Sequence, residues 1–201
     1  MSFQARDAAA ACSSVRPECW ADIVRWRQGE RQRLIAARLA IDAEERRRKA
    51  GRIAGLLDLT ISRVSGRIVG AYWPFRGEPD LRDWMISVVK RGGRIALPVV
   101  IQKGWPLEYR IWLPGDPLEH SAGNIPAPSR GPAVRPDIVI APVVGFDQAH
   151  YRLGYGSGFI DRTLAAMPRR PIAVGVGYRE AEIETIHPQP HDIAMDVVLT
   201  D

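Results

Sequence analysis

The stretch Asp137-Ile138-Val139-Ile140-Ala141-Pro142-Val143-Val144 decides the fold class of this chain. After the opening aspartate it is apolar at every position, without the alternation of a strand that has one wet face. A run of this kind is typical of a central strand in a parallel sheet that is covered on both sides. Helical and strand-like segments alternate along the rest of the chain, which predicts a three-layer α/β/α fold with a mostly parallel sheet.

The other strands are expected where short apolar or alternating runs are bounded by turn residues, over 67–73, 94–100, 107–112, 171–176 and 195–199. Apolar periodicity and capping residues predict helices over 20–40, 42–57, 80–91 and 159–167. Asp42 and Glu45 have the spacing of a capping box at the start of the second helix. Residues 114–136 are rich in proline and are expected to be loop.

Length and composition indicate one soluble globular domain. The chain has 201 residues, of which 46% are hydrophobic and 25% charged. Residues 1–19 lack apolar periodicity and are expected to form a poorly ordered extension before a domain over 20–201. Cys12 and Cys19 have neither the number nor the spacing of a disulfide framework or zinc site, which predicts a reduced, cytoplasmic environment. No segment has the length of a membrane span or the pattern of a secretory signal, so no membrane contact is expected.

The net charge of +5 is compatible with several partners. The basic run 44–52 includes acidic residues, and such mixed charge at helical spacing favours a solvated helix face over a nucleic-acid surface. A mild positive field also suits a polyanionic small molecule, such as a nucleotide or a polyglutamylated folate. RNA binding through the basic helices is a separate hypothesis that depends on charge alone and requires a steep salt dependence. We expect small-molecule partners and no nucleic acid.

The segment most informative about chemistry is 152–162, Arg-Leu-Gly-Tyr-Gly-Ser-Gly-Phe-Ile-Asp-Arg. Alternate glycines between a buried strand and a helix let backbone N–H groups approach an anion closely. Arg152 can bind phosphate oxygens, and Asp161 offers an oxygen ligand to a magnesium ion on the phosphates. The segment lacks the Gly-Lys-Ser/Thr ending of a Walker motif and the glycine spacing of a dinucleotide fingerprint. The alternative is a glycine-rich turn without a ligand.

Phe146-Asp147 and the run 151–162 together resemble the signature of the 5-formyltetrahydrofolate cyclo-ligases, also called methenyltetrahydrofolate synthetases. That signature reads approximately Phe-Asp, a short gap, then Arg-Leu-Gly-Tyr-Gly-x-Gly-Tyr-Tyr-Asp-Arg. The resemblance covers about residues 25–200 and includes the segments 72–80, 96–112, 135–137 and 190–192.

The resemblance implies a cytoplasmic ligase of one-carbon metabolism that depends on ATP and Mg²⁺, and we expect it to be a monomer. In the implied reaction, the formyl oxygen of 5-formyltetrahydrofolate is phosphorylated by ATP, which gives an imidate-like phosphate. The folate N10 then attacks, phosphate leaves, and 5,10-methenyltetrahydrofolate forms. Such catalysis needs mainly positioning and charge neutralisation.

Carried over residue by residue, the resemblance implies an ATP site made of Arg27, Arg31, Arg152, Leu153, Gly154, Tyr155, Gly156, Ser157, Gly158, Phe159 and Ile160. Magnesium would be held by Asp161 and Asp192. The reduced folate would contact Trp73, Glu78, Tyr155, Gly156, Ser157, Gly158 and Phe159. A carboxylate such as Glu78 can accept hydrogen bonds from the amino and ring N–H groups of a pterin.

Several of these residues also have a purely structural interpretation. Arg27 and Arg31 would then be exposed helix arginines, and Asp192 a cap or turn residue. Trp73 would be part of the core and Glu78 an ordinary loop charge. In the strand 107–112, Tyr109 and Trp112 have an odd spacing, so at most one of them is expected to face the substrate pocket.

Some positions depart from the family pattern. Phe159 and Ile160 stand where the family has two tyrosines, Ala127 stands where glutamate is common, and Ala181 lies about where many members have glutamine. Arg27 occupies a position that usually holds lysine. These departures favour, as the alternative to an active cyclo-ligase, a divergent paralogue that binds nucleotide or folate or acts on another formamide-like substrate.

Overall fold

The computed structural model describes residues 19–120 and 126–201, so most of the predicted N-terminal extension lies outside it. In this part of the chain the main sheet consists of β1 (Ile68–Gly70), β2 (Arg94–Val99), β3 (Glu108–Trp112), β6 (Ala133–Val134), β7 (Ile138–Pro142), β10 (Ile172–Gly177) and β11 (Val197–Thr200). The strand order is β11-β10-β7-β1-β2-β3-β6. The first five strands in this order run parallel, whereas β3 is antiparallel to β2 and β6 to β3.

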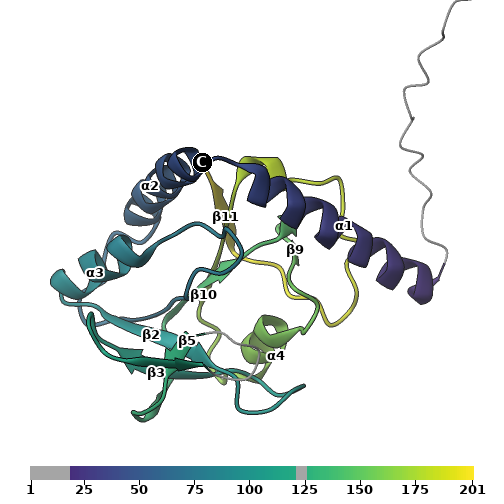
Figure 1. Ribbon diagram of the computed structural model, residues 1–201. Coiled ribbons are helices and arrows are strands. Elements are labelled where there is room, and N and C mark those ends of the chain that lie inside the picture. Colours follow the sequence, from purple (N-terminus) through teal and green to yellow (C-terminus); the bar gives the residue numbers. More distant parts are fainter. Residues whose placement is uncertain (1–18, 121–125) are drawn as a thin grey trace, which may run out of the picture.

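The helices of the described residues are α1 (Trp20–Ala40), α2 (Ala43–Thr60), α3 (Arg82–Lys90) and α4 (Phe159–Ala166). α2 and α3 pack on one face of the sheet through Ile53 and Met85, and α4 packs on the opposite face through Leu164 (Figure 1). The predicted three-layer α/β fold with a mostly parallel sheet is therefore confirmed. Among these helices, none combines the length and the apolar character that crossing a membrane requires.

The strand β7 is central and buried on both faces, as its apolar sequence predicts. Ile138 and Ile140 belong to the core on the side of α2 and α3, while Val139 and Ala141 belong to the core on the side of α4. None of these four side chains is more than 1% exposed. Burial stabilises the fold by about 1.5–3 kcal/mol for each of the larger aliphatic side chains.

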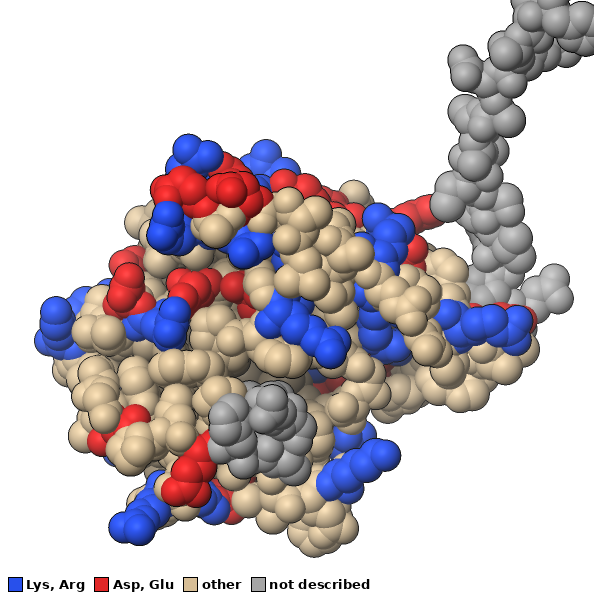
Figure 2. All heavy atoms as spheres, in the orientation of Figure 1, with Lys and Arg blue, Asp and Glu red and all other residues tan. Residues whose placement is uncertain are grey.

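The start of α2 shows how local sequence sets an element. Asp42 accepts hydrogen bonds at Oδ1 from the backbone N–H groups of Glu44 (2.8 Å) and Glu45 (3.4 Å), as an N-cap does. The side chain of Glu45 forms ion pairs with Arg48 and Arg52. The cap at Asp42 is confirmed, but the reciprocal bond of a capping box is absent among the described residues because Glu45 pairs with arginines instead. The run 44–52 forms the mixed-charge helix face that was predicted. Figure 2 shows basic and acidic side chains interspersed over this part of the surface.

The expectation that 114–136 is entirely loop was wrong. Within its described residues, β4 (Leu118–His120) pairs with β5 (Pro126–Pro128) in a separate two-stranded sheet. β6 extends the edge of the main sheet by pairing with β3. Proline lacks a backbone N–H group but is tolerated in edge strands, so a proline-rich composition does not exclude short pairings of this kind.

Candidate functional site

A short hairpin presents the glycine-rich loop. β8 (Gly145–Phe146) pairs antiparallel with β9 (Arg152–Leu153), and residues 154–158 lead from β9 into α4. Gly156 has φ of 97° and Gly158, the N-cap of α4, has φ of 60°. Glycine adopts this left-handed conformation without strain, which other residues do not. The loop ends at the first turn of α4, whose free N–H groups and helix dipole favour a bound anion.

Asp147 organises this hairpin from within. Its carboxylate is 3% exposed and accepts hydrogen bonds at Oδ1 from the N–H groups of Ala149 and Tyr151, each 3.1 Å long. Its Oδ2 accepts a third, also of 3.1 Å, from the N–H of Ile186. The aspartate of the Phe-Asp pair therefore builds the turn and also fixes the C-terminal segment that leads to Asp192.

One face of α1 buries arginines instead of apolar side chains. Its buried residues are Arg27, Leu34 and Arg38, and Arg31 is half-buried between them. At 3.6 residues per turn these four positions lie on one side of the helix. Buried guanidinium groups require hydrogen-bond acceptors. The interpretation of Arg27 and Arg31 as ordinary exposed helix arginines is therefore wrong.

Arg27 connects α1 to the C-terminal segment. It donates hydrogen bonds to the carbonyls of Ile186 and His187, both 2.9 Å, and to Oδ2 of Asp192 at 2.5 Å. Asp192 also accepts from the N–H of Gln189 at 2.7 Å, so it is a turn residue as well as an ion-pair partner. Burial alone would raise the pKa of Asp192, but the hydrogen bonds from Arg27 and Gln189 outweigh it and lower that pKa.

Arg31 lies beside the loop without a carboxylate partner among the described residues. Its Nε donates to the carbonyl of Gly154 at 2.7 Å. A Cβ placed on Gly156 would lie 3.4 Å from the guanidinium carbon of Arg31. Burial and the neighbouring charge of Arg27 both lower the pKa of Arg31. A cation that is partly desolvated beside another cation favours an anionic ligand.

The other two arginines of the site pack against loop glycines. A Cβ on Gly154 would lie 2.8 Å from Nη1 of Arg152, and a Cβ on Gly158 would lie 3.0 Å from Nη1 of Arg162. Nη2 of Arg152 donates to Oδ2 of Asp161 at 2.9 Å, while its buried Nε has no partner among the described residues. The glycines thus leave room for guanidinium groups at the loop, which any side chain would displace.

These groups enclose a cleft of about 230 Å³. It is lined by Trp20, Val24, Arg27, Arg31, Arg152, Leu153, Gly154, Gly156, Ser157, Gly158, Asp161, Arg162, His191 and Asp192. Four arginines face two carboxylates, and the resulting excess of positive charge suits a polyanion. The cleft brings together most of the residues predicted for ATP and both residues predicted for magnesium. Tyr155, Phe159 and Ile160 do not line it.

The predicted magnesium site depends on the carboxylates of Asp161 and Asp192. Asp161 and Asp192 line the same cleft, and each is hydrogen-bonded to an arginine, Arg152 and Arg27 respectively. No group of three or more His, Cys, Asp or Glu side chains that could hold a metal occurs in 19–120 or 126–201. Magnesium on a nucleotide is commonly held by one or two carboxylates together with phosphate oxygens. The two aspartates fit an ion of that kind.

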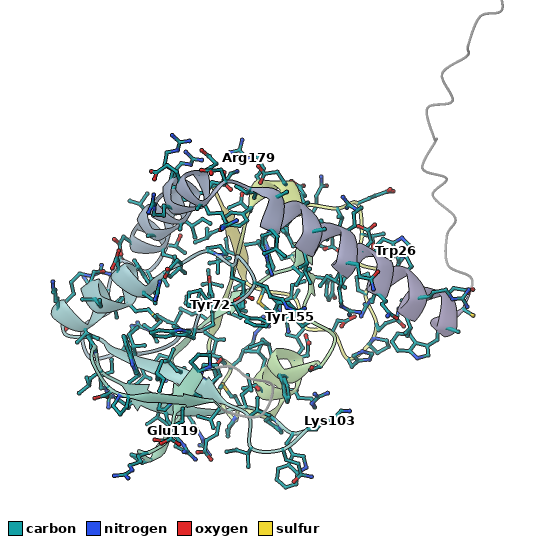
Figure 3. The ribbon with its side chains drawn as sticks, viewed as in Figure 1. Trp26, Tyr72, Lys103, Glu119, Tyr155 and Arg179 are labelled. Atoms are coloured by element: carbon teal, nitrogen blue, oxygen red, sulfur yellow. The ribbon has the colours of Figure 1, made fainter. Side chains whose placement is uncertain are left out.

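Tyr155 connects the loop with a second cluster beyond the cleft. Figure 3 shows it in the middle of the molecule, between α1 and the strands. Its hydroxyl accepts a hydrogen bond of 2.5 Å from Nη2 of Arg38, and its ring lies edge-on to that of Phe75 at 6.0 Å between centroids. Nε of Arg38 donates to the carbonyl of Arg76 at 3.0 Å. Tyr155 is thereby held against the segment that carries Glu78.

Glu78 is a buried carboxylate and not an ordinary loop charge. It is 5% exposed and accepts a hydrogen bond of 2.9 Å from the N–H of Phe75. Burial raises its pKa to about 7, although the charge of Arg38, the N–H of Phe75 and the hydroxyl of Tyr155 act in the opposite direction. Near neutral pH this group can therefore exchange a proton, and it can accept N–H donors from a ligand.

Trp73 lies in a separate cleft. Trp112 lines that cleft with it, with 5.7 Å between ring centroids, and the guanidinium of Arg82 lies 5.5 Å from the Trp73 ring. Trp73 also packs against the core on the side of α2 and α3, which agrees with the core interpretation. Tyr109 belongs to the core on the opposite face of the sheet, so only Trp112 of this pair reaches a cleft near Trp73.

Sequence reasoning missed Arg38, Arg162, Trp20 and His191, which belong to the cleft or to the Glu78 cluster. Arg38 follows Arg31 by seven residues, the spacing of two helical turns, and this periodicity is the signal that could have found it. Arg162 stands inside the glycine-rich signature itself. Trp20 and His191 are far apart in the sequence, and only the fold brings their rings to 5.9 Å.

The departures from the family pattern lie mostly in packed positions. Ala127 is 2% exposed in β5, and Ile160 packs against the core on the side of α4. The guanidinium carbon of Arg162 lies over the ring of Phe159, 5.6 Å from the ring centroid. Ala181 ends a short 3-10 turn, Arg179–Ala181. None of these four side chains lines the arginine cleft.

The fold and the site define an α/β protein with an arginine-lined cleft at a glycine-rich loop and a buried carboxylate, Glu78, whose pKa is about 7. Residues 23–201 match the model of the 5-formyltetrahydrofolate cyclo-ligase family. The chain belongs to this family, which confirms the resemblance read from the glycine-rich signature.

Similar proteins agree with this assignment. The 5-formyltetrahydrofolate cyclo-ligase of Mycolicibacterium smegmatis is 34% identical over 152 residues, which cover 69% of this chain and 75% of that protein. The enzyme of the same name from Haemophilus influenzae is 28% identical over 147 residues, covering 69% and 78%. The NMR structure of Aquifex aeolicus 5,10-methenyltetrahydrofolate synthetase superposes with a TM-score of 0.74 at 28% identity, covering 86% of this chain and 88% of that one.

Proposed function

We propose that this chain converts 5-formyltetrahydrofolate to 5,10-methenyltetrahydrofolate with release of ADP and phosphate, the ligase reaction of its family. The observation that carries the proposal is the arrangement of the site: four arginines and the glycine loop surround one cleft, and Tyr155 of that loop lies close enough to the buried carboxylate of Glu78 to interact with it electrostatically. A site for a triphosphate and a site for a substrate with N–H donors therefore adjoin.

The nucleotide phosphates would bind in the arginine cleft. Arg27 and Arg31 would neutralise the phosphates from α1, while Arg152 and Arg162 would do so from the side of the loop. Arg31 is free for this role because it has no carboxylate partner among the described residues. The N–H groups at the start of α4 add hydrogen-bond donors where negative charge develops during phosphoryl transfer. Preorganised donors of this kind lower the barrier because they need no rearrangement in the transition state.

We propose Mg²⁺ as the metal, bound with the nucleotide by Asp161 and Asp192. When bound, it would supply charge neutralisation on the phosphates. The arginine partners of the two carboxylates hold them in place at the same cleft.

The pterin would bind at Glu78. Its raised pKa means that the free enzyme holds a carboxyl group near its titration point at neutral pH. Pterin N–H donors would favour the ionised form and so lower that pKa on binding. Tyr155 would fix the position of the carboxylate relative to the loop, so the substrate and the phosphates would be oriented by one connected set of residues. Trp73 and the loop residues 156–159 complete the proposed folate contacts.

In the proposed reaction the formyl oxygen attacks the γ-phosphorus, and the bond to the bridging oxygen breaks to release ADP. The folate N10 then attacks the formyl carbon, loses its proton, and phosphate leaves with the former formyl oxygen. The protein needs no covalent nucleophile for these steps. Its own contributions are orientation of the two substrates and neutralisation of the phosphates.

We also propose that the enzyme acts in the cytoplasm as a monomer, on small molecules and not on nucleic acid or membranes. The part of this proposal that concerns nucleic acid is supported by the ion pairs of Arg47 with Glu44 and of Arg48 and Arg52 with Glu45, because they offset much of the positive charge of α2.

The test is an absorbance assay for methenyltetrahydrofolate with purified protein, 5-formyltetrahydrofolate, ATP and Mg²⁺. We expect product only when ATP and the metal are both present, and much less product from Arg31→Ala. Calorimetry with each substrate provides the control for binding. Binding of ATP without any turnover or folate binding would instead support the divergent paralogue.

A further inference from the structure

We propose that Trp20, together with Val24, forms a platform for the nucleobase at the outer end of the arginine cleft. This inference rests on the proposed function, because it takes ATP as the occupant of that cleft. Both side chains line the cleft with the four arginines. They belong to the first two turns of α1, whereas the sequence pattern assigned nucleotide contacts only from Arg27 onward.

On the face of α1 that lines the cleft, the type of side chain changes along the helix. Trp20, Val24, Arg27 and Arg31 follow at intervals of four, three and four residues, which places them on one side of a helix. At 1.5 Å per residue, Trp20 and Arg31 are about 16 Å apart along the axis. Apolar side chains therefore come first, and the cationic side chains follow. A nucleotide has the same order, with an apolar base at one end and charged phosphates at the other.

The contacts at the C-terminal end of this face of α1 indicate which way a nucleotide would lie in the cleft. Arg38 lies two turns beyond Arg31 and donates a hydrogen bond to Tyr155, which interacts electrostatically with Glu78. The phosphoryl group that is transferred must face the substrate at Glu78. The base, at the opposite end of the nucleotide, must then extend along α1 toward Trp20.

The exposure of the platform residues supports a ligand there. Trp20 is 53% exposed and Val24 is 42% exposed, although both line a cleft and neither belongs to a core cluster of the described residues. His191 orients the indole through an edge-to-face contact with 5.9 Å between ring centroids. Stacking on an aromatic ring tolerates any base, since every base has a π-face. The platform should therefore add affinity for the nucleoside with little selectivity for adenine.

The test compares binding of ATP, GTP and inorganic tripolyphosphate, each with Mg²⁺, by calorimetry. Trp20→Ala should weaken ATP and GTP about tenfold and leave tripolyphosphate unchanged, because only the nucleosides reach the platform. Trp20→Phe should restore most of the loss. In turnover, Trp20→Ala should raise KM for ATP and leave kcat unchanged, as expected for a contact made equally in the ground and transition states.

Trp26 provides a matched control. It lies on the same helix and makes the same type of edge-to-face contact with His187, at 4.6 Å, but it does not line the cleft (Figure 3). Trp26→Ala should leave both nucleotide and tripolyphosphate binding unchanged. A Trp20→Ala variant that loses tripolyphosphate in the same proportion as ATP, or loses neither, would overturn the platform. Wild-type protein that binds none of the three ligands would overturn the proposed ATP site itself.

Discussion

Arg38 and Tyr155 are 117 positions apart in the sequence, and a hydrogen bond of 2.5 Å joins the guanidinium of one to the hydroxyl of the other. It connects α1 with the glycine loop. The same hydroxyl also interacts electrostatically with Glu78, so the position of the loop and the charge state of the carboxylate depend on each other. This link between the two proposed substrate sites leads to the first two predictions.

Tyr155→Phe should weaken folate use more than it weakens the fold. The change removes the hydroxyl that accepts a hydrogen bond from Arg38 and interacts with Glu78, so we expect kcat/KM for 5-formyltetrahydrofolate to fall about tenfold. Tyr155 is 40% exposed, and the free energy of unfolding should change by less than about 1 kcal/mol. Steady-state kinetics and urea unfolding measure the two effects. Tyr109→Phe is the control, because its hydroxyl is buried without a partner among the described residues; an equal loss there would contradict the prediction.

Stability should decrease with rising pH because of Glu78. Its pKa is about 7 in the folded protein and near the ordinary 4.5 in the unfolded chain. Between these values the unfolded chain releases this proton first, so the free energy of unfolding falls as pH rises from about 4.5 to 7, by at most about 3 kcal/mol. Below and above that window this group adds no further dependence. Glu78→Gln should abolish this component, which urea unfolding at pH 5 and pH 7.5 would measure; unchanged pH dependence in the variant would refute it.

Arg27 and Arg31 should differ in what they stabilise. Arg27→Ala leaves Asp192 and two backbone carbonyls without their partner, so we expect a loss of about 3 kcal/mol in unfolding free energy together with weaker ATP binding. Arg31→Ala breaks one bond to a carbonyl and no carboxylate pair within the described residues. Its unfolding free energy should change by less than about 1 kcal/mol, while KM for ATP rises by one to two orders of magnitude, about 1.5–3 kcal/mol.

Thermal unfolding and ATP titration of the two arginine variants test this contrast. Arg31→Lys retains the positive charge but lacks the paired N–H donors of a guanidinium group. Its ATP affinity should therefore lie between those of Arg31→Ala and the wild type. If Arg27→Ala and Arg31→Ala destabilised the protein equally, the prediction would be contradicted, because only Arg27 is paired with Asp192.

Gly156→Ala should reduce ATP binding beyond its effect on the backbone. Gly156 has φ of 97° and Gly104 has φ of 83°, and a Cβ in this region costs about 1–2 kcal/mol at either position. At Gly156 the methyl group would also lie 3.4 Å from the guanidinium carbon of Arg31, whereas at Gly104 it would meet nothing within 4 Å. Both variants should lose similar stability, but only Gly156→Ala should lose ATP affinity in calorimetry. Loss of affinity in Gly104→Ala would contradict this.

The sequence predicted the elements that carry a local signal. The apolar run of β7, the cap at Asp42 and the alternate glycines before α4 each determine their structure through neighbours in the chain. The strands between 118 and 134 were missed because their proline-rich composition is typical of loops, although β4 pairs with β5 nearby in the chain and β6 pairs with the edge strand β3.

The site was predictable where the family signature names a residue and less so elsewhere. Arg38 continues the helical spacing of Arg27 and Arg31, but its acceptors are the carbonyls of Arg76 and Val143 and the hydroxyl of Tyr155, all distant in the sequence. Trp73 lines a cleft that Glu78 does not line, which likewise depends on the path of the chain. The partners in such tertiary contacts cannot be identified from helical periodicity alone.

The partners of Arg27 also have a consequence for biosynthesis. Its hydrogen bonds reach residues 159 to 165 positions later in the chain. The ribosome releases the N-terminal region first, so α1 emerges before the acceptors of its arginines have been synthesised. Without those acceptors, burying the guanidinium groups is unfavourable in free energy. Binding competence must therefore wait until the segment ending at Asp192 has been translated, and a nascent protein interrupted before that point should have a sheet but no nucleotide cleft.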